Sequence, residues 1–302
     1  MTTKSIKQIE YFENKLIEEK VNFFILDQYD GDVENFGKQW RDYRDVQIDS
    51  KNNFFISKDY MKKMLFNDFD IIKNKEVLEI GSGAGRFTEY FAKYAKKCVS
   101  IDLSSAIYHN VSLKNKNIIF LKSDFNKLKP AKKFDIVFCR GVLQHTPNPM
   151  KSLKNIHAFV KKNGYVFFDI YKMPKIGYLH PKYCLWRPLI KNYIKYESFE
   201  NFLKKNIYFL LLLKRIIKKL FLNSNFISDC FIPIWDYKGT YDLSNKELEK
   251  WAIMDTLDGI YAKYDYPQNY NKIKKFLIKN NINIISSNKN LNIFKTQIKN
   301  DS

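Results

Sequence analysis

The spacing of hydrophobic and polar positions changes character along the 302-residue chain. Residues 54–71 have apolar side chains at helical spacing. From residue 76 onward, short apolar runs alternate with amphipathic segments, which predicts strands over 76–80, 98–103, 118–124, 134–141 and 164–171 and helices over 86–95 and 149–162. Strands that alternate with helices indicate a parallel sheet, and runs that are apolar almost throughout are expected where helices cover both faces.

This alternation stops at about residue 172 and resumes near residue 266. The stretch between is rich in aromatic residues and lysine and contains four prolines, so we expect it to be an inserted cap. A helix over 270–281 and strands over 282–287 and 291–298 then complete the sheet. The expected organisation is an N-terminal lid over 1–53, a core over 54–171 and 266–302, and a cap over 172–265.

The N-terminal part has weaker signals. Residues 1–16, "MTTKSIKQIEYFENKL", are charged and amphipathic, which predicts a helix and not a signal peptide. Residues 29–50 are rich in Asp, Gly and aromatic residues and are interpreted as a loop with aromatic anchors. No run approaches the length of a membrane span, so no transmembrane helix is expected. Widely spaced cysteines fit thiols in a reducing cytosol, so we expect a cytoplasmic protein.

The net charge of +20 admits two explanations. One is an anionic partner such as nucleic acid or a membrane surface. The other is compositional drift, which we favour because the lysines are spread along the chain and accompany other residues with AT-rich codons. The four cysteines are far apart in the sequence, so neither a zinc site nor a disulfide framework is expected.

The segment "EVLEIGSGAGRF" (76–87) places glycines at 81, 83 and 85 after an expected strand. A dinucleotide-binding loop requires its third glycine where this chain has Arg86, and no G-K-[ST] follows as in a phosphate-binding loop. Glycines at this spacing let the backbone approach a ligand closely, and a following helix start offers N–H groups and positive dipole to an anion.

"LEIGSGAGR" resembles the first motif of class I S-adenosylmethionine-dependent methyltransferases. The resemblance continues in order with Asp102 in "SIDLS", Asp124 in "KSDF", "FDIVFCRGVLQHTPNP" and "KKNGYVFFDIY". It implies an α/β, Rossmann-like, doubly wound seven-stranded sheet, parallel with one antiparallel strand, together with the N-terminal lid and the inserted helical cap.

The resemblance also implies the residues that bind S-adenosylmethionine. Gly81, Gly83 and Gly85 would approach the methionine half, Glu79 would lie near its amine, and Arg140 would face the same end. Asp102 would accept hydrogen bonds from both ribose hydroxyls. The adenine would lie at Asp124 and Phe125. For Asp102 a helix N-cap role is the alternative, with Ser104 as a competing cap. Asp124 is alternatively a simple loop acid, Glu79 a purely structural residue and Arg140 a surface charge.

The acceptor is less well defined by the sequence. The Pro-Pro-aromatic element of base-methylating enzymes is absent after the fourth strand, so a nucleic-acid partner is not expected, whereas "VLQHTPNP" resembles the corresponding segment of small-molecule methyltransferases. We therefore expect a small-molecule, glycan or lipid-linked acceptor and O-methylation by in-line transfer. The alternatives are a non-catalytic cofactor-binding scaffold of the same fold and an RNA-directed methyltransferase.

His145 is the candidate general base for a hydroxyl acceptor, with a structural histidine as the alternative. His180 and Tyr183 are weaker candidates, and Trp40 and Tyr29 are expected to close over the site or to pack in the core. No metal site is expected.

Residues 206–223, "NIYFLLLLKRIIKKLFLN", combine a long apolar run with two basic pairs, Lys214–Arg215 and Lys218–Lys219. On a helix the pairs share one face. This pattern is typical either of a cap helix with its lysines in solvent or of a helix lying on an anionic membrane surface. A peripheral membrane contact is therefore a hypothesis for this segment, beside a partner interface.

Overall fold

The computed structural model describes residues 11–13, 18–20, 23–26, 33–52 and 54–299. The chain divides into two compact units. Unit 1 comprises Met1–Arg41, Gln47–Lys172 and Tyr264–Ser302, and unit 2 comprises Asp42–Val46 and Met173–Lys263. Each unit is described by itself.

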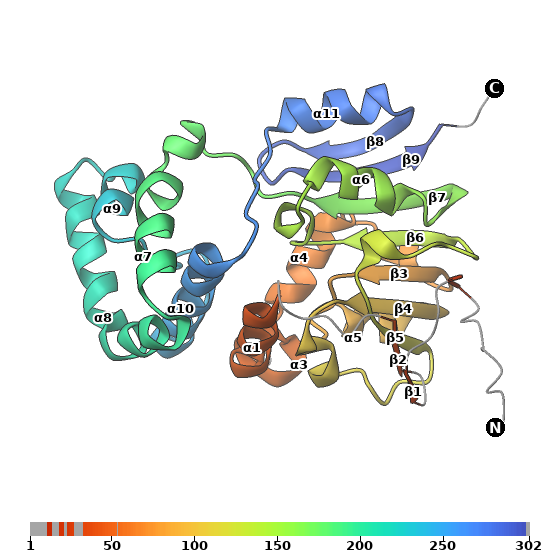
Figure 1. The fold of residues 1–302 in the computed structure, drawn as a ribbon, viewed down its shortest axis with the longest axis horizontal. Helices are drawn as coiled ribbons and strands as arrows, with labels where there is room; N and C mark the ends of the chain where they lie inside the picture. Colours follow the sequence, from red (N-terminus) through yellow and green to blue (C-terminus); the bar gives the residue numbers. More distant parts are fainter. Residues whose placement is uncertain (1–10, 14–17, 21–22, 27–32, 53, 300–302) are drawn as a thin grey trace. The chain divides into compact units, whose positions relative to one another are not determined.

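Unit 1 is built on a sheet with the order β1-β2-β5-β4-β3-β6-β7-β9-β8 (Figure 1). The predicted strands are all present: β3 Glu76–Ile80, β4 Lys97–Asp102, β5 Ile118–Lys122, β6 Phe134–Cys139, β7 Val160–Asp169, β8 Ile282–Asn288 and β9 Ile293–Ile298. Strands β3 to β7 pair in parallel, and β9 is antiparallel to both β7 and β8. The predicted α/β, Rossmann-like fold with one antiparallel strand in this set is confirmed.

The strand count differs from the prediction, because the described sheet has nine strands instead of seven. The two additional strands are β1 (Glu18–Lys20) and β2 (Phe23–Ile25), which form a hairpin. Strand β2 pairs in parallel with β5, and Phe23 stacks on Phe120. Strands of three residues are too short for their alternation to be read from the sequence.

The interpretation of residues 29–50 as a loop was wrong for the part that the structure describes. Residues 33–52 contain three helices, α1 (Glu34–Asp42), α2 (Arg44–Gln47) and α3 (Asp49–Asn52). The helical spacing of Phe36, Trp40 and Tyr43 was masked by the many polar residues between them. The predicted helix over 1–16 lies largely outside the described residues; within it, Phe12 forms a β-bridge with Pro130.

Helices cover both faces of the sheet. Helices α6 (Pro149–His157) and α11 (Tyr270–Lys279) contribute to the hydrophobic cluster on one face, and α4 (Ile56–Met64) and α5 (Thr88–Tyr94) to the cluster on the other. Helix α6 ends earlier than predicted because β7 already begins at Val160. Helix α5 begins at Thr88, two residues later than expected.

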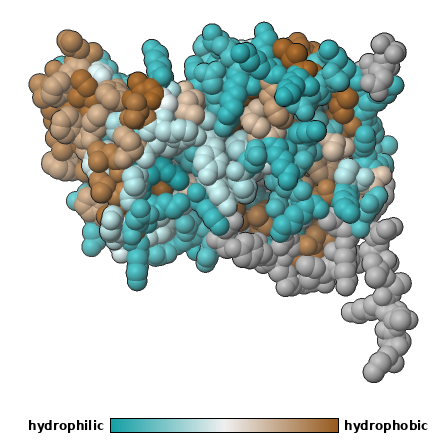
Figure 2. Space-filling model, turned by 45° about the horizontal axis from the view of Figure 1, so that its top comes forward, coloured by the Kyte–Doolittle hydropathy of each residue, from teal (hydrophilic) through white to brown (hydrophobic). Residues whose placement is uncertain are grey.

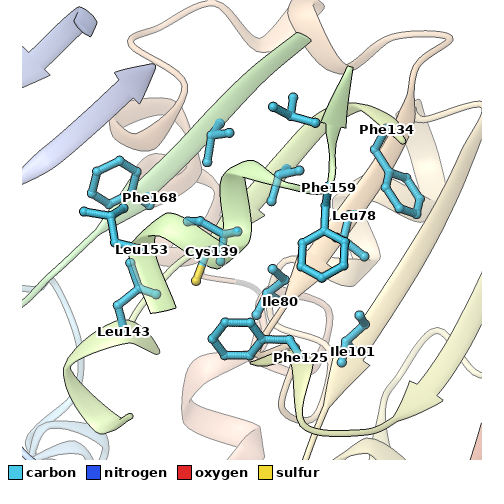
Figure 3. Packing of buried hydrophobic residues seen from close by; sticks show 14 of the residues in the cluster. Leu78, Ile80, Ile101, Phe125, Phe134, Cys139, Leu143, Leu153, Phe159 and Phe168 are labelled. Atoms are coloured by element: carbon cyan, nitrogen blue, oxygen red, sulfur yellow. The ribbon is translucent and has the colours of Figure 1, made fainter. Parts of the chain in front are cut away.

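The alternation within β3 separates the two faces. Leu78 and Ile80 point into one cluster, while Val77 lies in the other. Figure 3 shows the first cluster, in which side chains of the strands meet those of α6 and of the segments after the strands. The labelled members that surround the ends of the central strands are Ile80, Ile101, Phe125, Cys139, Leu143 and Leu153. This packing fixes the carboxyl ends of β3, β4 and β6.

Unit 2 is helical in the part that the structure describes. It contains two single-turn helical segments, η5 (Gly177–Leu179) and η6 (Lys182–Trp186), followed by four α-helices: α7 (Arg187–Tyr193), α8 (Tyr196–Leu220), α9 (Asn225–Phe231) and α10 (Asn245–Tyr261). Among the described residues, no helix is both long and apolar enough to cross a membrane.

The prediction that both basic pairs of α8 lie on one polar outer face was wrong. Lys214 is buried, where its ammonium donates to Asp229 and to the backbone oxygen of Ile234. Arg215 forms a two-pronged ion pair with Asp236, with N–O distances of 2.7 and 2.8 Å. The first basic pair therefore holds α8 against the segment 229–236.

Lys214→Ala is expected to lower the free energy of unfolding of the protein by about 3 kcal/mol, because it leaves the Asp229 carboxylate and a buried carbonyl without their cation. Urea unfolding measures this change. The matched control is Lys205→Ala, an exposed lysine of the same helix, which is expected to change stability by less than about 0.5 kcal/mol. Equal unfolding midpoints for the two variants would contradict the buried ion pair.

Candidate functional site

The glycine loop that follows β3 is fastened to the end of β4. The N–H groups of Gly81 and Ser82 donate to the backbone oxygen of Ile101 at 2.8 and 3.0 Å. Gly81, Gly83 and Gly85 have φ angles of 78°, 53° and 101°. Such backbone conformations favour glycine, which explains its presence at all three positions.

Close neighbours also exclude side chains from the loop. A Cβ atom at Gly81 would lie 2.0 Å from Val142 Cγ2, and one at Gly83 would lie 2.8 Å from Trp40 Cε2. The indole of Trp40, from α1, thus rests directly on the loop. This contact leaves both expectations for Trp40 open, closure over the site and packing in the core, whereas Tyr29 lies outside the described residues.

Asp102 ends β4 and points at the glycine loop. Its Oδ2 accepts the N–H of Gly83 at 2.7 Å, and its Oδ1 accepts the N–H and the hydroxyl of Ser104 at 2.8 and 2.6 Å. Burial raises the pKa of the Asp102 carboxyl above its ordinary value. The N-cap of the following short helix, η2 (Ser105–His109), is Ser104, so Asp102 does not have the alternative capping role.

Asp124 and Phe125 follow the neighbouring strand, β5. The N–H of Ser123 donates to the backbone oxygen of Asp102 at 3.1 Å, which brings the two acidic strand ends together. Asp124 caps the short helix η3 (Phe125–Lys127) by accepting the N–H of Asn126 at 2.9 Å. The ring of Phe125 is buried in the hydrophobic cluster of Figure 3.

Glu79 lies in β3, buried on the face that α5 covers. Its Oε2 accepts hydrogen bonds from the hydroxyls of Thr88 at 2.7 Å and Ser100 at 2.9 Å. Burial raises the pKa of Glu79 from 4.5 to about 7, and the neighbouring charge of Asp102 acts in the same direction. A buried carboxyl group with a raised pKa in the strand before a glycine loop is a candidate functional group.

Replacing Glu79 with glutamine is expected to remove a pH-dependent loss of stability. Because the folded-state pKa is raised, the folded protein retains a proton that the unfolded chain releases, so wild-type stability falls as the pH rises from 4.5 to about 7. The stability of Glu79→Gln relative to wild type should therefore rise by about 3 kcal/mol between about pH 4 and pH 8. Urea unfolding at several pH values measures this, and a constant difference between the two proteins would contradict it.

Arg140, directly after β6, is enclosed and not on the surface as the alternative prediction had it. Its guanidinium carbon lies 4.1 Å from the ring centroid of Tyr60, and its Nε lies 3.7 Å from Oδ2 of Asp169. Asp169 ends β7 and accepts the N–H of Gly141 at 2.6 Å. Neither Asp169 nor Tyr60 was predicted as a site residue from the sequence. Asp169 could have been found, because it is an acidic residue near the end of the fifth expected strand.

His145 lies in the short helix η4 (Leu143–His145) after β6. Its Nδ1 is 2.9 Å from the backbone oxygen of Tyr264. A carbonyl oxygen only accepts, so in the neutral ring the proton is on Nδ1 and Nε2 is the acceptor. The rings of Phe36 and Tyr171 lie edge-on to the imidazole, at centroid distances of 5.0 and 5.5 Å.

Four buried polar atoms at this edge of the sheet make no hydrogen bond within the described part of the chain. One is a carboxylate acceptor, Glu79 Oε1, and the others are Ser82 Oγ, Arg140 Nε and Gln144 Nε2. Buried polar atoms are normally paired, so such a group indicates a binding site for a polar ligand. One acceptor that favours a cation and several donors that favour an anion match a ligand carrying both charges.

The sequence-predicted residues are therefore brought together in two neighbouring groups. The first group is the glycine loop with Gly81, Gly83 and Gly85, to which Asp102 is hydrogen-bonded. Asp124 lies next to this group because the preceding residue, Ser123, is hydrogen-bonded to Asp102. Arg140 and His145 lie in the segment after β6. Phe125 differs, because its ring packs in the core beneath the site.

A family model described as a methyltransferase domain matches residues 51–204, just over half of the chain. Among curated proteins, the chain is 31% identical over 114 residues to a ubiquinone biosynthesis O-methyltransferase of Coxiella burnetii (strain Dugway 5J108-111), a match covering 36% of this chain and 49% of that protein. It is 26% identical over 216 residues to the protein of the same name from Rickettsia canadensis (strain McKiel), covering 68% and 82%. The chain thus spans about half the length of the first of these relatives.

Solved structures with a related arrangement have low identity to the chain. The magnesium protoporphyrin IX methyltransferase ChlM of Synechocystis PCC 6803, with bound S-adenosylhomocysteine, has a TM-score of 0.45 and 13% identity over 87% of this chain and 94% of its own. The N-methyltransferase NodS of Bradyrhizobium japonicum WM9, with the same ligand, has a TM-score of 0.38 and 19% identity over 46% and 74%.

Proposed function

The chain belongs to the methyltransferase-domain family, and on this premise we propose that it transfers a methyl group from S-adenosylmethionine to a hydroxyl of a small-molecule, glycan or lipid-linked acceptor. The family match confirms the resemblance inferred from the glycine loop and the acidic strand ends. The donor-site roles, the acceptor atom and the residues that act in the transfer are parts of the proposal.

The observation that carries the proposal is the set of four buried polar atoms without hydrogen-bond partners beside the glycine loop. The methionine end of the donor has one ammonium and one carboxylate. Glu79 Oε1 would accept from the ammonium, and Arg140 and Gln144 would donate to the carboxylate. The residues present therefore fit the charged methionine end of S-adenosylmethionine.

The nucleoside end would be bound by the acidic strand ends. Asp102 would accept a ribose hydroxyl on its one remaining acceptor position, since a carboxylate has about four lone-pair positions and the chain already supplies three donors. Asp124 would accept from the exocyclic amine of the adenine. Phe125 would support this turn from below, because its ring is already packed in the core.

Helix α1 gives the predicted N-terminal lid a physical basis. It places Trp40 on Gly83 and Phe36 on His145, so two aromatic rings cover the loop and the candidate base. Such a cover would exclude water from the transfer and would place a π face beside the donor's cation. The assignment of 1–53 as a lid and of 172–265 as a cap is part of this proposal.

Bound S-adenosylmethionine supplies an electrophilic methyl group on its sulfonium. His145 would accept the proton of the attacking hydroxyl at Nε2, because Nδ1–H is held by the backbone oxygen of Tyr264. Donor and acceptor would be held in line by the surrounding contacts, which supply most of the rate enhancement in such transfers.

Oxygen is proposed as the methylated atom because the curated relatives carry the name O-methyltransferase. Incubation of the protein with methyl-labelled S-adenosylmethionine and a panel of phenols, catechols and sugars tests the proposal. Label in an O-methyl product is expected. Donor binding without transfer to any member of the panel or to a cell metabolite extract would instead favour the non-catalytic cofactor-binding alternative.

A further inference from the structure

One surface of unit 2 exposes large apolar side chains in a continuous row along α8. Phe209, Leu212, Ile216 and Leu220 recur at intervals of three or four residues, which places them on one side of the helix. Their exposed fractions run from 42% for Leu212 to 73% for Leu220. Leu222, in the turn after the helix, is 96% exposed. We call these five residues the α8 row.

The α8 row belongs to an apolar area of unit 2. Figure 2 shows hydrophobic side chains gathered on the part of the molecule that carries α8 and α9 at the left of Figure 1. Helix α9 and the preceding turn add exposed phenylalanines, and Phe221 stacks on Phe231. Soluble monomers rarely expose contiguous apolar areas of this kind unless the area binds something.

The charged residues of the segment that carries the row have one sign. Lys205 lies one turn before Phe209, and Lys219 lies one turn before the end of the row, so each end carries an exposed lysine. Residues 201–228 contain six Lys or Arg and no Asp or Glu. Two of the six, Lys214 and Arg215, turn inward to Asp229 and Asp236, which neutralises the acidic groups of the next segment.

We propose that the α8 row is a docking surface for an anionic lipid bilayer. Apolar side chains would enter the headgroup boundary, and the flanking lysines would remain at the level of the lipid phosphates. A second copy of the chain is a poorer occupant, because pairing this face with itself would bring lysines against lysines without an acidic partner. The proposal does not depend on the methyl-transfer reaction.

Co-sedimentation of the full chain with vesicles tests this surface. Vesicles of phosphatidylglycerol and phosphatidylcholine should bind the protein at low salt, with affinity falling as salt increases, and pure phosphatidylcholine vesicles should bind it much less. Lys205→Ala/Lys219→Ala is expected to weaken binding about 30-fold, on the basis of about 1 kcal/mol per lysine. Leu212→Ser/Ile216→Ser should weaken it by about 100-fold.

Matched controls come from the exposed side of α11 and the strand after it. Lys274→Ala/Lys275→Ala makes the same change in net charge, and Ile278→Ser/Ile285→Ser removes exposed apolar side chains of similar size. Both controls should bind vesicles like wild type. Urea unfolding, compared with wild type, shows for every variant whether the fold is intact.

Three outcomes would overturn the proposal. The first is no binding of wild type to anionic vesicles at low salt. The second is equal weakening of vesicle binding by the control variants. It would show that vesicle binding depends on total charge or on nonspecific adsorption of apolar side chains. The third is a dimer in sedimentation velocity that Leu212→Ser/Ile216→Ser disperses, which would assign the row to a second copy of the chain.

Discussion

His145→Ala is expected to lower the rate of methyl transfer by about 10²- to 10⁴-fold, which is the usual contribution of a general base. The reason is the geometry around the ring: the backbone oxygen of Tyr264 fixes the proton on Nδ1, so in the neutral ring Nε2 carries the basic lone pair. Since His145 has no assigned contact with the donor, the affinity for S-adenosylhomocysteine should be unchanged. Single-turnover kinetics with the labelled donor measures the rate, and calorimetry measures the affinity.

A second variant separates the base from a positioning role. His145→Asn keeps an amide N–H near the position of Nδ1, so it can still donate to Tyr264, but it has no basic nitrogen. It should be as slow as His145→Ala. If asparagine restored most of the turnover, the histidine would be a structural anchor of the loop. His180→Ala, in unit 2, tests the weaker base candidate in the same assay and should retain turnover.

Asp102→Ala is expected to weaken the binding of S-adenosylhomocysteine by about 10- to 100-fold, because a hydrogen bond from the ribose to a charged group would be lost. The same side chain accepts from Gly83 and Ser104, so the alanine variant also loosens the glycine loop. Asp102→Asn retains one oxygen acceptor and should therefore bind with intermediate affinity.

The control for Asp102 is an aspartate of the same sheet that lies away from the loop. Asp135, at the start of β6, accepts the N–H of Glu76 and pairs with Lys161 at 2.9 Å. Asp135→Ala should lower stability while leaving the affinity for S-adenosylhomocysteine unchanged. Equal affinities of Asp102→Ala and wild type would remove the ribose assignment.

The sequence predicted the central sheet well because its determinants are local. Five apolar runs with helical segments between them specify parallel strands, and the three glycines occupy left-handed conformations that other residues rarely adopt. Site residues at the ends of strands, such as Asp102 and Arg140, could be predicted because the carboxyl ends of parallel strands lie at the same edge of the sheet.

The missed features depend on contacts between distant segments. Trp40 was named from the sequence, but its contact with Gly83, 43 positions away, was not, because no pattern within α1 indicates that pairing. Lys214 was predicted to be in solvent because its helix position faces a polar stripe, whereas its burial depends on Asp229 and on the fold of the segment after it. Glu79 was predicted as a site residue from the sequence, but its raised pKa was not, because it follows from burial of the carboxyl group in the folded protein.

The account rests most heavily on the donor site, and titration of the wild-type protein with S-adenosylhomocysteine in a calorimeter tests it most directly. We predict saturable binding at one site per chain, with tighter binding at about pH 8 than at about pH 6, because an ionised Glu79 would face the ligand's ammonium. Absence of binding at both pH values would contradict the assignment of the glycine loop as the methyl-donor site.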